Sequence, residues 1–149
     1  MNENKEIVVS SETTISNSLD RMNKVKKFTT LSVETEEDVK KIYNATQDCD
    51  VRLNDIVNQE IEIEGIYIEE RPTTTLDDET GEVKEGSKFR TILFGTDGKT
   101  YVAGAYGIYN SISEIIGLFG FPTPEKPMKL LVKKRPIGDG KETLVLKYI

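Results

Sequence analysis

The chain has 149 residues, which is enough for one compact domain with an extension and too few for two independent hydrophobic cores. Hydrophobic residues make up 36% of the chain, charged residues 31%, and the formal net charge is −6, as in a soluble globular protein. The apolar stretches are too short to span a membrane, and the polar N-terminus does not resemble a signal peptide, so we expect a cytoplasmic protein.

The missing residue types exclude several kinds of chemistry. The chain has no histidine, which removes the commonest general base and the commonest zinc ligand. Cys49 is the single cysteine, so an intrachain disulfide cannot form. We therefore expect neither a zinc site nor a nucleophile activated by histidine.

The negative net charge hides an uneven distribution. Residues 86–149 carry a net charge of +5, whereas residues 1–85 carry −11. A basic face can therefore coexist with an acidic body, although an uneven surface without any partner is an equally good interpretation of the charge alone.

The first segment of the chain is polar. Residues 1–27 are rich in Ser, Thr, Asn and charge, and Ile15, Leu19 and Met22 at helical spacing are their only sign of order. We expect a flexible N-terminal arm that ends in a basic cluster at residues 24–27, which either contacts phosphates or stays solvated. β-favouring residues then predict a short strand over residues 28–33.

A helix is predicted to begin after Thr35, whose hydroxyl can cap the backbone amide of Asp38. Acidic residues at 36–38 lie at the positive end of the helix dipole, and good helix formers run out at residues 44–47.

The next segment indicates a bent strand. Ile61 and Ile63 alternate with glutamates, and Ile66 and Ile68 resume the alternation out of phase after Gly65. One extra residue at a β-bulge would return the later isoleucines to the inner face and bend the strand. Because bent strands build small barrels, we favour a bulge over a flat strand.

A long connection and a hairpin follow. Residues 71–87 are mostly polar and predict a long exposed loop or a loosely formed hairpin. Residues 89–94 and 99–106 are predicted to be antiparallel strands, joined by a turn at residues 95–98 that contains the Asp-Gly signal.

The last segment predicts a helix and two strands. Asn110 is expected to cap an amphipathic helix that ends at Gly120, and strands are expected over residues 128–135 and 142–149. Three strands, a helix and two more strands, with a glycine-bent first strand, are typical of the five-stranded OB barrel, which has a helix between strands 3 and 4. We therefore predict a mainly β protein with two short helices. One OB-fold domain would cover residues 28–149, with its barrel over residues 56–149.

Several stretches carry a resemblance to a known family. They are residues 27–31, 35–38 and 43–45, the bent strand 61–68, the hairpin 89–101 and residues 106–112. In this order they resemble the bacteriophage-type OB-fold single-stranded DNA-binding proteins from phages and mobile elements of Gram-positive bacteria. The resemblance covers residues 28–149 and rests on the order of weak motifs, not on a single fingerprint.

The resemblance implies a protein that coats single-stranded DNA during replication or recombination, without sequence preference, inside a bacterial host cell. It leaves open replication or recombination proteins as further partners, and it leaves open a homo-oligomer. The chain departs from the commonest pattern because it has no tryptophan and ends in an expected strand instead of an acidic tail. We therefore expect Tyr and Phe to stack with the bases, and no recruitment of partners through a tail.

A binder of single strands needs aromatic faces for the bases and cations for the phosphates, and OB barrels carry both on strands two and three. Because burying Arg90 unpaired would be costly, we place Arg90 and Phe94 outside, which puts Phe89 in the core, and we also place Tyr101 outside. The predicted nucleic-acid-binding residues are Arg90, Phe94, Lys99, Tyr101, Tyr106, Lys129, Lys133, Lys134 and Arg135. The alternatives are core positions for the aromatic residues and, for the cations of strand four, a charged edge that limits aggregation.

Two other functions are compatible with parts of the sequence. An enzyme would need a metal held by residues 77–79, but a solvated turn explains these acidic residues better, and no phosphate-binding loop is present. We therefore predict no catalysis and no cofactor. The remaining alternative is an OB-fold module that binds proteins and not nucleic acid, because the fold alone does not decide the function.

Overall fold

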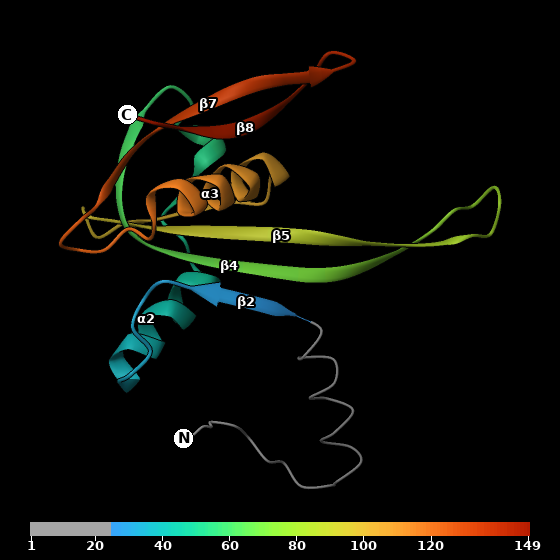
Figure 1. Cartoon of the computed structure of the whole chain (residues 1–149). Helices are drawn as coiled ribbons and strands as arrows, with labels where there is room; N and C mark the ends of the chain where they lie inside the picture. Colours follow the sequence, from blue (N-terminus) through green and yellow to red (C-terminus); the bar gives the residue numbers. More distant parts are fainter. Residues whose placement is uncertain (1–24) are drawn as a thin grey trace, which may run out of the picture.

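The computed structural model describes residues 25–149, and the predictions for residues 1–24 lie outside this range. Within it, seven strands form one curled sheet in the order β3-β6-β5-β4-β7-β8, and β2 pairs with β4 beside this path (Figure 1). The strands are β2 (Lys26–Thr29), β3 (Val51–Arg52), β4 (Glu60–Leu76), β5 (Val83–Gly95), β6 (Thr100–Ala103), β7 (Met128–Gly138) and β8 (Lys141–Tyr148). The helices are α2 (Glu36–Gln47), α3 (Tyr106–Phe119) and the short 3-10 turn η1 (Leu53–Asp55).

The sheet is an OB-like half-barrel. Strands β4 to β8 correspond to the five predicted barrel strands, and α3 lies between β6 and β7 in the sequence, as expected. The predicted number of five strands is wrong, because β2 adds to one edge of β4 by antiparallel pairing and β3 adds to β6 by parallel pairing. The mainly β class with two α-helices is confirmed for the described residues. None of the helices between residues 25 and 149 is long and apolar enough to cross a membrane.

The predicted β-bulge in β4 is confirmed. The pairing of β4 with β5 shifts register between Ile63 and Gly65, so one residue of β4 is left without a partner. The shift brings the isoleucines on both sides of the bulge to one buried core. Gly65 packs closely, because a Cβ atom there would overlap the end of the Leu31 side chain, which would have to move.

The two helices cover opposite sides of the β4–β5 sheet. In Figure 1, α3 lies between β5 and the β7–β8 hairpin, whereas α2 lies beyond β4 on the other side, next to the end of β2. The larger core contains Ile108, Ile112 and Ile115 of α3, packed against β4 to β8. The smaller core contains Ile42 and Ala45 of α2. The smaller core is completed by Tyr67, Ile92 and Phe94 from the sheet.

The helix starts show where local signals were sufficient. Thr35 caps α2 as predicted, because its hydroxyl accepts from the Asp38 amide and the Asp38 carboxylate accepts from the Thr35 amide. The predicted start of α3 at Asn110 is wrong, because the helix begins at Tyr106 and Asn110 lies inside it. Gly107 in the first turn of α3 permits this early start, since a Cβ atom at that position would overlap the backbone carbonyl of Leu144 on β8.

Residues 71–87 form a regular hairpin, which was one of the two predicted alternatives. Pairing of β4 with β5 continues without interruption to Leu76 and Val83, and the turn is closed by the Asp77 amide, which donates to the Glu82 carbonyl at 2.8 Å. This hairpin extends well beyond the rest of the molecule (Figure 1).

Candidate nucleic-acid interface

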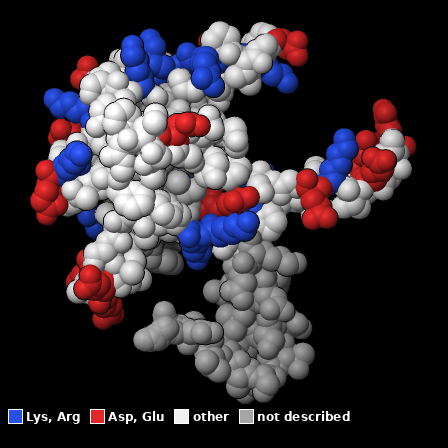
Figure 2. All heavy atoms as spheres, viewed as in Figure 1, with Lys and Arg blue, Asp and Glu red and all other residues white. Residues whose placement is uncertain are grey.

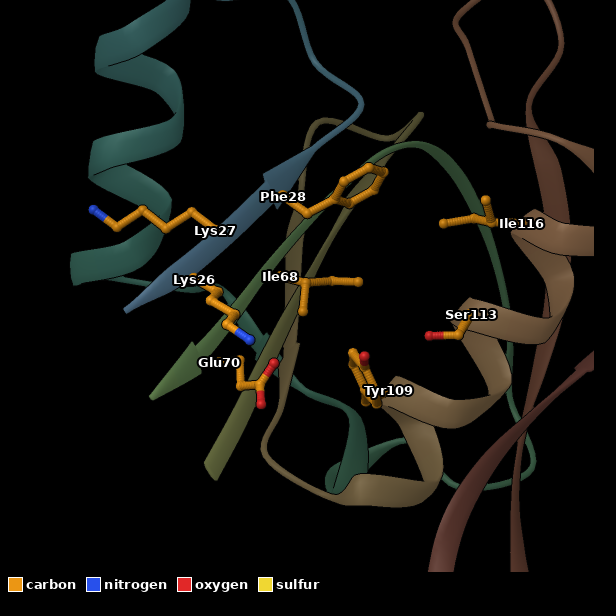
Figure 3. Close-up of a pocket in the computed structure, with 8 residues that line it drawn as sticks. All are labelled: Lys26, Lys27, Phe28, Ile68, Glu70, Tyr109, Ser113 and Ile116. Atoms are coloured by element: carbon orange, nitrogen blue, oxygen red, sulfur yellow. The ribbon is translucent and has the colours of Figure 1, made fainter. Parts of the chain in front are cut away.

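A groove between β2, β4 and α3 collects partly exposed aromatic side chains. It has a volume of about 370 Å³, and Phe28 of β2 points across it toward Ile116 of α3, while Ile68 of β4 points into the same space beside Phe28 (Figure 3). We call this the aromatic groove, and its lining residues are Lys26, Lys27, Phe28, Ile68, Glu70, Tyr109, Ser113 and Ile116. Its exposed lining is predominantly apolar, and the rings of Phe28 and Tyr109 offer flat faces to a ligand.

An aromatic cluster extends the groove at Tyr109. The ring of Phe89 stacks on Tyr109 with centroids 4.0 Å apart, and the ring of Tyr106 meets Phe89 edge to face at 5.6 Å. Phe121 follows α3 in the chain, and the centroid of its ring lies 5.8 Å from that of Phe28 on β2. Tyr106 remains 62% exposed, so one end of the cluster is open to a base from solvent.

Strand register and helix periodicity bring these rings together. Phe28 lies opposite Ile68, and Phe89 lies opposite Glu70, so both phenylalanines point to the α3 side of the sheet. Tyr106 and Tyr109 are three residues apart in the first turn of α3, and they therefore lie on one face of the helix.

Cations lie at the rim of the aromatic groove. Lys26 is exposed and lies opposite Glu70 at the edge of the sheet, where its ammonium group can reach a phosphate. The surface over α3 is largely uncharged, and basic side chains gather above it on the β7–β8 hairpin and below it near the start of β2 (Figure 2). An apolar, aromatic floor with cations at its edges suits a strand of single-stranded nucleic acid.

Two predicted site residues are buried. Phe94 does lie on the face of β5 that points away from the main core, but α2 covers that face and leaves Phe94 only 2% exposed. The expected outward position of Tyr101 is wrong, because it shares its face with Leu93, its partner on β5, and is 7% exposed within the main core. The assignment of Phe89 to the core is wrong too, since Phe89 is only partly buried beside the open end of the aromatic cluster.

Tyr101 has a structural partner. Its hydroxyl donates to the Asp97 carboxylate at 2.6 Å, which ties β6 to the β5–β6 turn. Burial and this hydrogen bond raise the pKa of Tyr101 to about 12. The same hydrogen bond from Tyr101 is the main cause that lowers the pKa of Asp97.

Arg90 is partly exposed and held from two sides. Its Nη2 donates to the backbone carbonyl of Thr46 at the end of α2, and its Nη1 lies 4.0 Å from Glu69 Oε1. Because the Glu69 carboxylate lies close by, the charged guanidinium of Arg90 is tolerated next to the smaller core under α2.

The other predicted residues are exposed and lie on three parts of the molecule. Lys99 is in the β5–β6 turn, and Tyr106 is in the aromatic cluster, although on α3 and not on a strand. The exposed cations on β7 are Lys129, Lys133, Lys134 and Arg135.

Sequence reasoning missed Phe28, Tyr109 and Phe121. The three-residue spacing of Tyr106 and Tyr109 was a usable signal, but it required the correct start of α3. Nothing local indicated that Phe28, on a strand far away in the sequence, faces the same groove.

The fold and this groove define a class of protein: a small OB-like β protein with an aromatic groove that is rimmed by cations. Comparison of the sequence with known families gives the particular assignment. Residues 21–148 match the family described as phage single-stranded DNA-binding protein. The chain belongs to this family, and the resemblance found in the sequence is confirmed. No curated protein and no solved structure matches the chain.

Proposed function

We propose that the protein binds single-stranded DNA without a sequence requirement, with bases stacked in the aromatic groove and phosphates on the surrounding cations. The observation that carries the proposal is the stack of Phe89 on Tyr109 beside the exposed ring of Tyr106. Every nucleobase has a flat face, so stacking on such rings is tolerant of sequence.

The few polar groups in the groove support this tolerance. Besides the two lysines, polar atoms along its lining come from Ser113, Glu70 and the Tyr109 hydroxyl, and Glu70 already accepts from Ser87 at 2.9 Å. A surface that reads sequence would need several fixed donors and acceptors aimed at base edges.

The family assignment supports the biological role. We propose that the protein acts without catalysis, in replication or recombination of phage DNA within the host cytoplasm. The cations on β7 and Lys99 remain proposed phosphate contacts, because they are exposed and not paired with a carboxylate among the described residues.

The test is fluorescence anisotropy of a labelled oligo-dT strand, titrated with the full chain at low and moderate salt. A duplex of equal length serves as competitor. We expect tight binding that the duplex does not displace and that weakens as salt rises. The logarithm of the binding constant should fall with the logarithm of the salt concentration by about 0.7 for each phosphate that the protein neutralises on a single strand.

Absence of binding at low salt would contradict the proposal. It would instead favour the protein-binding module, which could then be sought by cross-linking to replication proteins of the host and phage. Equal affinity for the duplex would also contradict it, because a groove built for stacking needs unpaired bases.

A further inference from the structure

A second groove lies on the α2 side of the sheet, on the face opposite to the aromatic groove. It has a volume of about 450 Å³ and is formed by α2, β2 and β4. Lys26 and Lys27 are neighbours on β2 and point to opposite faces, Lys26 toward the aromatic groove and Lys27 toward α2 (Figure 3). We call the second groove the α2 groove, and its lining includes Lys27, Val39, Tyr43, Tyr67, Glu69 and Arg71.

The side of the α2 groove that α2 provides is apolar and open to solvent. Val39 and Tyr43 are four residues apart, so they lie on one face of the helix. Val39 is 49% exposed and Tyr43 is 60% exposed, whereas Ile42 and Tyr67, which line the same groove, are buried in the smaller core. Exposed apolar side chains beside a groove mark a contact surface for another molecule.

The free edge of β2 borders the α2 groove. The Thr30 amide donates to the Ile66 carbonyl at 3.0 Å, and the register of β2 with β4 continues from this bond. Because hydrogen-bonded residues alternate along an antiparallel pair, the backbone groups of Lys27 and Thr29 point away from β4. No strand within residues 25–149 pairs with this edge of β2. An unpaired edge of this kind accepts an extended segment of another chain.

Basic side chains gather at one end of the α2 groove. The Arg71 side chain lines it and is 59% exposed, and Lys27 lines it from β2. Within residues 25–149, no carboxylate lies at ion-pair distance from the Lys27 ammonium group. The acidic first turn of α2, residues 36–38, is at the other end of the helix from Thr46, whose carbonyl accepts from Arg90. The groove therefore offers a positive end to a negatively charged group.

Glu69 is the one carboxylate that lines the α2 groove in the described part of the chain, and it is enclosed. It is 4% exposed, and its Oε2 accepts from the Tyr67 hydroxyl at 2.7 Å. Its Oε1 lies 3.6 Å from Arg71 Nη2 and 4.0 Å from Arg90 Nη1, so one charge is shared between two guanidinium groups. The contact with Arg71 is an ion pair without a hydrogen bond, since Glu69 Oε1 accepts none. Arg71 can therefore donate hydrogen bonds to a carboxylate of a partner.

The chemistry of the α2 groove fits a protein segment better than a strand of nucleic acid. The open backbone groups of β2 are complementary to another backbone, which a nucleic acid does not have. Tyr43 is in no ring pair among residues 25–149, and Val39 beside it has no flat face for a base. A protein segment can instead place an apolar side chain against these two residues and a carboxylate near Lys27 and Arg71.

We propose that the α2 groove and the free edge of β2 form a docking site for a partner protein. The partner contributes an extended segment that pairs with β2, with an apolar side chain against Val39 and Tyr43 and a carboxylate at Lys27 and Arg71. Because the two grooves lie on opposite sides of the sheet, the protein can hold this partner and single-stranded DNA at the same time. The docking site goes beyond the proposed function and does not depend on it.

The test begins with a phage-displayed library of random peptides of about 12 residues, which is long enough for one added strand. The library is selected on the immobilised full chain in the presence of excess oligo-dT, which keeps the aromatic groove occupied. Enriched peptides are synthesised with a fluorescent label and titrated by anisotropy. We expect these peptides to share an Asp or Glu close to a large apolar residue.

Two double variants distinguish the two grooves. K27Q/Y43A alters the α2 groove, and K26Q/Y106A makes the same changes on the other side of the sheet. All four side chains are exposed, so thermal melts should show that both variants are folded. We expect K27Q/Y43A to weaken peptide binding by about tenfold or more, as at interface hot spots, and K26Q/Y106A by less than about twofold. Equal weakening in both variants, or none in K27Q/Y43A, would overturn the docking site.

Methylation of the peptide backbone tests the pairing with β2. N-methyl groups on the alternate residues whose amides face β2 should abolish binding, because they remove the donors. The same groups on the intervening residues should change the affinity by less than about twofold, because those amides point away from β2. Equal effects of the two sets would overturn the strand pairing.

Photo-cross-linking distinguishes a partner protein from other occupants of the α2 groove. The full chain carries p-benzoylphenylalanine in place of Gln47, an exposed lining residue, and is irradiated alone, with oligo-dT and with a selected peptide. A cross-link to the peptide would support the docking site. A cross-link to residues 1–24 of the chain, to a second copy or to oligo-dT would overturn it, as would a library from which no peptide is enriched.

Discussion

The two sides of the β4–β5 sheet are built from the same strands but are covered by their helices to different extents. On the α3 side, the helix packs into the curl of the sheet and leaves the aromatic groove open at its edge. On the α2 side, the helix lies over Phe94, and Lys41 sits 5.6 Å above the same ring. The difference shows that a ring on this sheet stays accessible to solvent only where no helix covers it.

The largest expected effect is a difference in stability between substitutions in the larger core and in the smaller core. Ile112 of α3 is fully buried in the larger core, whereas Ile42 of α2 is at the edge of the smaller one. We expect I112A to lower the free energy of unfolding by about 4 kcal/mol and I42A by about 2 kcal/mol, because the cost of a cavity depends on how fully it is enclosed. Urea denaturation measures both values. Equal decreases would mean that the α2 side holds the fold as strongly as the α3 side.

A second pair of variants tests how closely α3 packs against β8. Gly107 faces the Leu144 carbonyl too closely for a Cβ atom, whereas Gly117 in the same helix has open space around it. We expect G107A to destabilise the protein by about 2 kcal/mol or more, in the range of overpacked sites. G117A should stabilise it by up to about 1 kcal/mol through helix propensity. Thermal melts of both variants would give opposite shifts, and a shift of the same sign would contradict this close packing.

A third pair tests which side binds DNA. Tyr106 and Tyr43 are similarly exposed, at 62% and 60%, but Tyr106 lies in the aromatic cluster and Tyr43 lies on α2. We expect Y106A to weaken oligo-dT binding by about 1–2 kcal/mol, the typical contribution of one base stacked on an aromatic ring, and Y43A to have no effect. Anisotropy titrations of the two variants provide the comparison. Weaker binding in Y43A alone would move the site to the α2 side.

The smallest expected effect concerns the start of α2. The Asp38 carboxylate accepts from the Ser32 hydroxyl at 2.8 Å and from the Thr35 amide at 3.2 Å, and these bonds lower its pKa below the ordinary 3.8. Its contribution to stability is therefore present above pH 3.8 and is lost as the pH falls through the lower folded value.

The measurement is the urea midpoint of the wild type and of D38N between about pH 6 and strongly acidic pH, a range that spans the titration of the carboxyl. We expect the wild type to be more stable at the upper end of this range, with a gap that closes as the carboxyl is protonated. Binding of oligo-dT at neutral pH should be the same in both proteins. A gap that does not change with pH would show that the stability difference does not come from the charge of the carboxylate, and the absence of any gap would show that the amide replaces it fully.

Local signals in the sequence decided the elements whose cause is local. The capping residues Thr35 and Asp38 located the start of α2, the phase change around Gly65 located the bulge, and the family resemblance followed from the order of the elements. The start of α3 could not be found in this way. It depends on Gly107 meeting the backbone of β8, which is a contact between residues far apart in the sequence.

The sequence by itself determined the mainly β class, the bent strand and the relationship to phage single-stranded DNA-binding proteins, because period, turn residues and motif order are properties of neighbouring residues. The tertiary structure decided which aromatic rings reach solvent. Strand parity alone put Phe94 and Tyr101 outside, but a covering helix buries the first and the curl of the sheet buries the second. Exposure depends on every element packed nearby, so it follows from the assembled fold and not from the alternation along one strand.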